Sequence, residues 1–121
     1  MPGPKILIVD DEKEICEVTK NFLGRRNYDC YTANSGKEAL EMAKQVRPEL
    51  VLLDVRLGEV SGLEILPQIK ALNQDTKVVM VTGLADAESV KEAKAQGALD
   101  VLAKPFSFDY LCDFLSKKLA E

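Results

Sequence analysis

Acidic residues directly follow two of the apolar runs in this chain. The first run ends in Asp10, Asp11 and Glu12 ("ILIVDDE"), and a later run ends in Asp54 ("ELVLLD"). Two carboxylates about 4 Å apart repel each other by roughly 4 kcal/mol at an effective dielectric constant near 20. If the fold brings these acids together, we therefore expect the cluster to need a cation.

A hydroxyl and an ammonium group follow two further apolar runs. Thr82 ends "KVVMVT" and Lys104 ends "ALDVLAK". Oxygen ligands without His or Cys favour a hard ion, and a site with few protein ligands and room for water favours Mg²⁺ over Ca²⁺. A carboxylate beside Mg²⁺, with a hydroxyl and a lysine nearby, can accept a phosphoryl group, because the cations neutralise the phosphoryl oxygens. Singly, each residue has an ordinary explanation, such as acids that complement a helix N-terminus.

The apolar runs that carry these residues predict β-strands. They cover residues 5–10, 29–33, 49–54, 77–83 and 98–104. Most lack alternation of polar and apolar residues, which is typical of strands covered on both faces. Helical periodicity lies between them, so the sequence predicts an α/β sandwich with a parallel sheet and right-handed crossovers. Because ligands bind at the carboxyl ends of strands in such sheets, the polar strand-end residues should meet at one edge.

The spacing of apolar residues predicts the buried faces of the helices. The first helix should bury Ile15, Val18, Phe22 and Leu23 and end near Gly24. The other helices should cover about residues 35–46, 61–72, 86–96 and 107–119, the last with a buried stripe of Phe108, Leu111, Leu115 and Leu119.

Local signals predict how two of these helices begin. Ser35 and Glu38 have the spacing of a capping box, as do Ser61 and Glu64. Pro67 fits poorly inside the third helix, because an interior proline removes a hydrogen bond and costs about 3 kcal/mol. We therefore expect a kink there or a delayed helix start.

Length and composition indicate one ordinary domain over residues 1–121, with 46% hydrophobic and 30% charged residues. No apolar run approaches the roughly 20 residues that cross a bilayer, and the first residues are not a signal peptide, so a cytoplasmic protein is expected. The net charge of −4, with scattered basic residues, disfavours nucleic-acid binding.

The histidine and cysteine content excludes several classes of site. The chain has no histidine, which excludes Ser-His-Asp and Cys-His catalysis, His-ligated zinc and an internal phosphohistidine. Cys16, Cys30 and Cys112 are far apart and have no CxxC spacing, so they are predicted to be reduced core thiols.

The order and spacing of four motifs resemble those of the receiver domains of two-component response regulators. The motifs are "ILIVDDE", "LVLLDVRLGEVSGLEIL", "VVMVTG" and "VLAKPF", and the resemblance covers essentially the whole chain. It implies a flavodoxin-like (βα)5 three-layer sandwich with a five-stranded parallel sheet in the order 2-1-3-4-5. It also implies a sensor histidine kinase or histidine phosphotransfer protein as phosphoryl donor, and a downstream effector protein or domain.

The resemblance implies specific roles for the acids. Asp54 would be the phosphoacceptor. Asp11 and Asp54 would bind Mg²⁺ directly, Asp10 would do so through water, and Arg56 through its backbone carbonyl.

It also implies that Thr82 bonds to one phosphoryl oxygen and Lys104 to another, and that the Lys104–Pro105 bond is cis. Partner binding would use the fourth helix, fifth strand and fifth helix, roughly residues 84–119.

The sequence departs from the family pattern in three ways. Leu57-Gly58 replaces the usual Met-Pro, which should loosen the loop after Asp54. Val101 stands where the family often has a Tyr or Phe that moves inward on activation, so signalling should rely on other parts of this surface. Arg56 and Leu84 occupy positions that govern access of hydrolytic water, and such a bulky pair predicts slow self-dephosphorylation.

Two other functions compete with that of a phosphorylation-dependent signalling switch, which the resemblance implies. An Asp-nucleophile phosphatase would need an Asp-x-Asp arrangement and a cap domain, and this chain has adjacent acids and no residues left for a cap. A receiver-like docking module that is never phosphorylated is the stronger alternative, although such modules tend to lack one of the acids.

Overall fold

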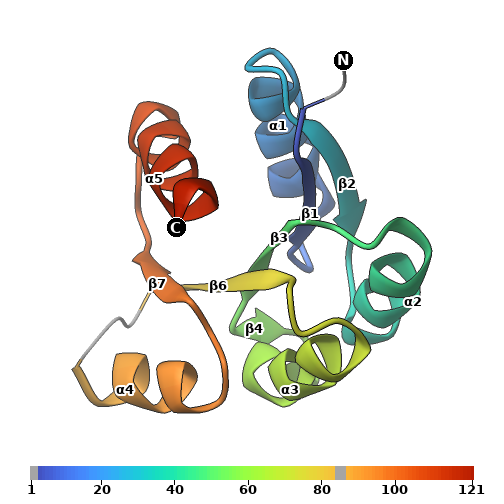
Figure 1. Ribbon diagram of the computed structural model, residues 1–121, viewed down its shortest axis with the longest axis vertical. Coiled ribbons are helices and arrows are strands. Elements are labelled where there is room, and N and C mark those ends of the chain that lie inside the picture. The colour runs from blue at the N-terminus through green and yellow to red at the C-terminus, as the bar shows by residue number, and fades with distance from the viewer. Residues whose placement is uncertain (1–2, 84–86) are drawn as a thin grey trace.

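A five-stranded parallel sheet forms the middle layer of the protein (Figure 1). The structure is a computed structural model that describes residues 3–83 and 87–121. The sheet has the strand order β2-β1-β3-β6-β7. Its strands are β1 (Lys5–Val9), β2 (Asp29–Ala33), β3 (Leu50–Asp54), β6 (Lys77–Thr82) and β7 (Asp100–Ala103). This is the predicted order of the five sheet strands, which confirms the flavodoxin-like fold.

Helices cover both faces of this sheet. They are α1 (Lys13–Gly24), α2 (Gly36–Val46), α3 (Gly62–Leu72), α4 (Ala87–Ala95) and α5 (Phe108–Ala120). One core cluster packs α2, α3 and α4 against one face of the sheet, and a second packs α1 and α5 against the other. All five residues of β3 are buried, as expected for a central strand covered on both faces.

The first helix buries only part of the predicted face, because Leu23 is buried and Phe22 partly buried against the same core cluster but Ile15 and Val18 are not. Its buried residues are Cys16, Thr19 and Leu23, whereas Ile15 is 40% and Val18 52% exposed. The observed face has the same helical spacing but is rotated by one residue. Small Cys and Thr side chains allow the helix to lie close to the sheet, which the larger Ile and Val side chains would prevent.

The predicted serine caps are present, but neither forms a complete capping box. Ser35 Oγ accepts a hydrogen bond from the Glu38 amide at 3.1 Å, while the Glu38 carboxylate accepts from the Asn34 amide. Ser61 Oγ accepts from the Leu63 amide at 3.1 Å. Each serine thus satisfies one amide of the first helical turn.

The helix α3 begins at Gly62 and continues through Pro67 to Leu72, so the expectation of a delayed start is wrong. Proline removes one helical hydrogen bond at this point. Burial of Ile65, Leu66 and Ile69 against the sheet offsets that loss.

A short antiparallel hairpin that the sequence did not predict lies between β3 and α3. Its strands are β4 (Arg56–Leu57) and β5 (Val60–Ser61), and Gly58 at the turn has a φ of +72°, a value that glycine adopts readily. Leu57 is buried and Arg56 is exposed. The buried Leu57 side chain thus anchors the hairpin, and with it the loop after Asp54, to the core.

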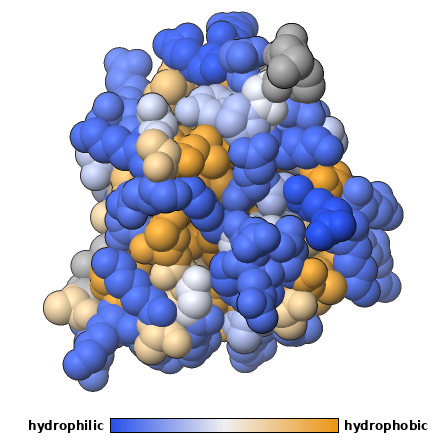
Figure 2. Space-filling model, viewed as in Figure 1, coloured by the Kyte–Doolittle hydropathy of each residue, from blue (hydrophilic) through white to orange (hydrophobic). Residues whose placement is uncertain are grey.

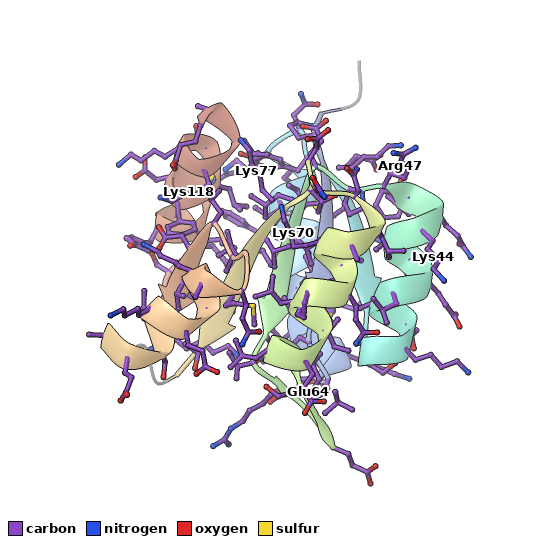
Figure 3. All side chains as sticks on the ribbon, turned by 60° about the horizontal axis from the view of Figure 1, so that its bottom comes forward. Lys44, Arg47, Glu64, Lys70, Lys77 and Lys118 are labelled. Atoms are coloured by element: carbon purple, nitrogen blue, oxygen red, sulfur yellow. The ribbon has the colours of Figure 1, made fainter. Side chains whose placement is uncertain are left out.

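Charged side chains at the helix ends divide between the two ends of the sheet. Figure 3 shows Lys44, Lys70 and Lys118, from the last turns of α2, α3 and α5, well away from Glu64 in the first turn of α3. The positive helix N-termini therefore lie on the side of the strand carboxyl ends, where they favour acidic groups.

The outer surface is mostly polar on the face seen in Figure 2, with apolar residues in separate small patches. Within residues 3–83 and 87–121, no helix is long and apolar enough to cross a bilayer.

Candidate functional site

Two buried carboxylates meet at the carboxyl ends of adjacent strands. Asp54 ends β3 and Asp10 follows β1, and these side chains belong to residues that are 7% and 5% exposed. Asp54 Oδ1 accepts from the Arg56 amide at 3.0 Å, and Asp10 Oδ1 accepts from the Glu12 amide at 2.9 Å. One oxygen of each carboxylate is thus fixed by the following loop, which leaves the other oxygen, Oδ2, to face a shared partner.

That shared partner is Lys104, at the end of β7. Its Nζ lies 2.7 Å from Asp54 Oδ2 and 3.7 Å from Asp10 Oδ2. The backbone amide of Lys104 donates to the Thr82 carbonyl at 2.8 Å, and the Lys104–Pro105 bond is cis, as the resemblance implied. Burial alone would lower the pKa of Lys104, but the hydrogen bond and charge of Asp54, with the charge of Asp10, raise it. The lysine is therefore a cation here.

One ammonium group does not fully compensate the two acids. The pKa of Asp10 is raised to about 6, first by burial and also by the charge of Asp54, which together outweigh the Glu12 amide and Lys104. A further cation close to Asp10 would stabilise its ionised form and so stabilise the folded protein.

An open cleft of about 710 Å³ leads to this cluster. Its polar end is lined by Asp11, Glu12, Asp54, Arg56, Thr82 and Lys104, and its other end by apolar residues that include Leu63, Met80, Ala93 and Val101. All predicted site residues except Asp10 therefore line one cleft, and Asp10 lies behind it against Lys104.

The neighbouring acids Asp11 and Glu12 differ from Asp10 in exposure. Asp11 is exposed and reaches the cleft from the solvent side. Glu12 is the N-cap of α1 in an extended conformation, and it lines the cleft.

The donor set suits a hydrated Mg²⁺ better than a fully enclosed ion. Among the residues that the structure describes, no three Asp, Glu or Cys side chains converge into a complete metal cage. Mg²⁺ characteristically retains several waters and binds through one or two carboxylates. The carboxylates supply oxygen ligands, and one ammonium group does not balance their charge. The cleft is open, which leaves room for the waters that Mg²⁺ retains.

Sequence reasoning missed two residues behind the acid pair. Asn34, just after β2, donates from Nδ2 to the Asp10 carbonyl at 3.0 Å, and Cys16 Sγ lies 3.5 Å from the same oxygen. The end of the second strand had been given no role. The available signal was that Asn34, like Asp10, is a polar residue directly after a strand.

All three cysteines are free, as predicted, but only Cys16 and Cys30 lie in the core, and the assignment of the partly exposed Cys112 to the core is wrong. Burial raises the pKa of both Cys16 and Cys30 to about 11, so these two thiols are neutral at physiological pH.

The raised pKa of Asp10 predicts a pH dependence of stability in metal-free protein. The folded state binds the Asp10 proton more tightly than the unfolded state, whose pKa is near the ordinary 3.8. The stabilising effect of protonation is complete below pH 4 and is lost as the pH rises through about 6. Asp10→Asn, which keeps an oxygen for the Glu12 amide, should remove this loss and raise stability at pH 7 by about 1–3 kcal/mol.

Urea unfolding of both proteins in EDTA between pH 4 and pH 8 measures this difference. A constant gap between wild type and Asp10→Asn across that range would contradict the assignment to Asp10.

Comparison with known proteins identifies the family. A family model described as "Response regulator receiver domain" matches residues 6–116, a span that includes every residue of the acid pair and its lysine. The chain belongs to the response regulator receiver domain family. Receiver domains are signalling domains of two-component systems and are not enzymes in the usual sense.

Similar proteins include both long and short members of this family. Transcriptional regulatory protein ZraR of Escherichia coli strain K12 is 42% identical over 95% of this chain, which spans only 26% of ZraR. Sporulation initiation phosphotransferase F of Bacillus subtilis strain 168 is 34% identical over 98% of this chain and 96% of its own length. The receiver domain thus corresponds to about a quarter of the first protein and nearly all of the second.

Solved receiver structures have the same fold. The CheY-like receiver domain protein of Methanospirillum hungatei JF-1 gives a TM-score of 0.91 at 30% identity, over 98% of this chain and 94% of that one. The receiver domain of NtrX from Brucella abortus gives 0.86 at 32% identity, over 95% of this chain and 98% of that one.

Proposed function

We propose that this receiver domain, acting as one unit over residues 1–121, is a cytoplasmic phosphorylation switch. Asp54 accepts a phosphoryl group from the phosphohistidine of a sensor histidine kinase or histidine phosphotransfer protein. The main support is that two buried carboxylates on adjacent strands share one ammonium group beside an open cleft. An oxygen of Asp54 attacks phosphorus, the new O–P bond forms as the P–N bond breaks, and the imidazole leaves with the bonding electron pair.

The acids and one backbone group would hold Mg²⁺ at the polar end of the cleft. Asp11 and Asp54 are proposed to bind it directly, Asp10 through water, and Arg56 through its backbone carbonyl. When bound, Mg²⁺ supplies positive charge next to the phosphoryl oxygens. The amides of Glu12 and Arg56 hold one oxygen of Asp10 and Asp54 in place, which supports the orientation of these ligands.

Lys104 and Thr82 would then stabilise the modified aspartate. Lys104 Nζ already contacts Asp54 Oδ2, so a small rotation of its partly exposed side chain carries the ammonium to a phosphoryl oxygen. The Thr82 hydroxyl would donate to another. The hydrogen bond from the Lys104 amide to the Thr82 carbonyl keeps the ends of β6 and β7 in register.

The output surface is proposed to comprise α4, β7 and α5, with the downstream effector as its partner and no role for nucleic acid. This surface was predicted at residues 84–119, of which 84–86, and so Leu84, lie outside the described residues. Val101 lines the apolar end of the cleft with Ala93 of α4. Because valine has no ring to reorient, the change is proposed to pass through Thr82, the loop that follows it and α4.

Incubation with a small phosphodonor and Mg²⁺, followed by intact mass measurement, tests the proposed function. We expect a gain of one phosphoryl group that requires Mg²⁺. Absence of any gain with several donors would favour the alternative of a constitutive docking module.

A Mg²⁺ titration should raise the thermal stability of the wild type, because the ion binds the folded state and relieves the repulsion between the acids. Saturation at 100 times the dissociation constant corresponds to about 2.7 kcal/mol. Asp11→Asn should lose most of this response because it removes a proposed Mg²⁺ ligand. Its metal-free stability should stay close to that of the wild type, since the Asp11 side chain is exposed. An unchanged response in Asp11→Asn would contradict its role as a ligand, and Ca²⁺ in place of Mg²⁺ provides the comparison of ions.

Self-dephosphorylation is proposed to be slow. The exposed Arg56 side chain lines the cleft, where it can hinder an attacking water, and Leu84 was predicted to act with it. We expect Arg56→Ala to shorten the phosphoaspartate half-life several-fold. A wild-type half-life of only seconds in Mg²⁺ would refute the prediction.

A further inference from the structure

The peptide group between Asp10 and Asp11 is held by side chains from two other elements. Asn34 Nδ2, after β2, donates to the Asp10 carbonyl oxygen at 3.0 Å. Cys16 Sγ, on α1, lies 3.5 Å from that oxygen. The Asp10 amide also donates to the Ala33 carbonyl at 3.1 Å. The amide of Asp10 is thus bonded to the last residue of β2, and its carbonyl to the residue that follows.

Asn34 and Cys16 also contact each other. Asn34 Nδ2 lies 3.4 Å from Cys16 Sγ, so the amide has two hydrogens for two acceptors, the sulfur and the Asp10 carbonyl. This arrangement fixes the orientation of the amide, because its oxygen could not bond to a carbonyl. Cys16 is 1% exposed, and the Asp10 carbonyl is the nearest of the carbonyls around its sulfur.

These contacts constrain the direction of Asp11. A peptide group is planar, so fixing the Asp10 carbonyl also fixes the Asp11 amide and leaves the Asp11 Cα little freedom. Asp11 is exposed, and none of the hydrogen bonds or ion pairs found among the described residues involves its own carboxylate. The place of its Cα at the cleft is therefore set by the backbone that precedes it, and the carboxylate can reach a metal only from there.

We propose that Asn34 and Cys16 form a clamp on the Asp10–Asp11 peptide and act as positioning residues for divalent-cation binding. The inference rests on the proposed function, since it concerns the same Mg²⁺ site. Mg²⁺ tolerates little departure from octahedral geometry, so a backbone that lets Asp11 turn away weakens binding. Groups that orient metal ligands without touching the metal typically contribute 10-fold to 100-fold to affinity.

The test compares Mg²⁺ affinity and stability in matched variants by calorimetric titration and urea unfolding. Asn34→Ala removes the donor, and we expect Mg²⁺ to bind about 10-fold more weakly. Ser35→Ala is the control, because it removes the neighbouring N-cap bond to the Glu38 amide and costs about 1 kcal/mol without touching the clamp. Asn34→Leu, which keeps the size but not the donor and adds no charge, should behave like Asn34→Ala.

The two measurements separate positioning from simple destabilisation. Loss of affinity in both Asn34 variants, with wild-type affinity in Ser35→Ala, supports the clamp. Equal affinities in wild type and both Asn34 variants overturn the clamp but leave the proposed function intact. A wild type that does not bind Mg²⁺ overturns both, and direct titration of the wild type distinguishes that case.

Discussion

Asp54→Asn should gain no phosphoryl group under conditions in which the wild type gains one. The asparagine side chain keeps the size of the aspartate and an oxygen that can accept from the Arg56 amide, which lies 3.0 Å from Asp54 Oδ1. It has no carboxylate to attack phosphorus and no charge to pair with Lys104. We therefore expect uptake to fall by at least about 100-fold while the fold is retained.

Intact mass after incubation with the phosphodonor and Mg²⁺ measures this loss directly. Asp113→Asn serves as the control, because within the described residues its exposed carboxylate forms one ion pair, with the exposed Lys117 on α5. It should take up the phosphoryl group as the wild type does. Uptake by Asp54→Asn at the wild-type rate would show that another residue is the acceptor.

Gly62→Ala should destabilise the domain by about 3 kcal/mol. Overpacking typically costs about 1–3 kcal/mol, and a rigid backbone neighbour puts this variant at the upper end. A Cβ at this position would lie 2.1 Å from the Asp54 carbonyl oxygen and 3.2 Å from the Met80 methyl group. The Gly62 amide also donates to the Val55 carbonyl at 2.7 Å, so the start of α3 cannot shift without losing that bond. Alanine's better helix propensity, worth up to about 1 kcal/mol, is too small to compensate.

Gly24→Ala gives the matched comparison for this prediction. Gly24 ends α1, and a Cβ there would meet nothing within 4 Å. We expect that variant to be as stable as the wild type or more stable by about 0.5–1 kcal/mol. Urea unfolding gives the free energy of unfolding of both variants. Equal values would contradict the prediction that a Cβ at position 62 clashes with the Asp54 carbonyl.

The strand ends were predictable because each depends on a short local pattern. Asp10, Asp54, Thr82 and Lys104 each end an apolar run, and parallel strands bring such ends to one edge. The family resemblance added the strand order and the cis bond before Pro105. These features combine local sequence with topology that many relatives share.

Other features depend on contacts that the sequence pattern does not contain. The face of α1 could not be chosen, because Ile15 and Cys16 both fit a helical stripe and only the sheet decides between them. The role of Asn34 depends on the separation between β1 and β2 at their ends, where its side chain reaches the Asp10 carbonyl. The hairpin of β4 and β5 has two-residue strands, too short for any periodicity.

The strand β6 joins the acid cleft to the far end of α5. Thr82 is its last residue, and its first residue, Lys77, donates from Nζ to the Lys118 carbonyl at 2.9 Å and the Leu119 carbonyl at 3.1 Å. An extended strand changes length very little, so its two ends are displaced together along its axis. A movement of Thr82 along the strand axis would therefore also move Lys77 and, through its hydrogen bonds, the last turn of α5. No aromatic side chain needs to rotate for this coupling.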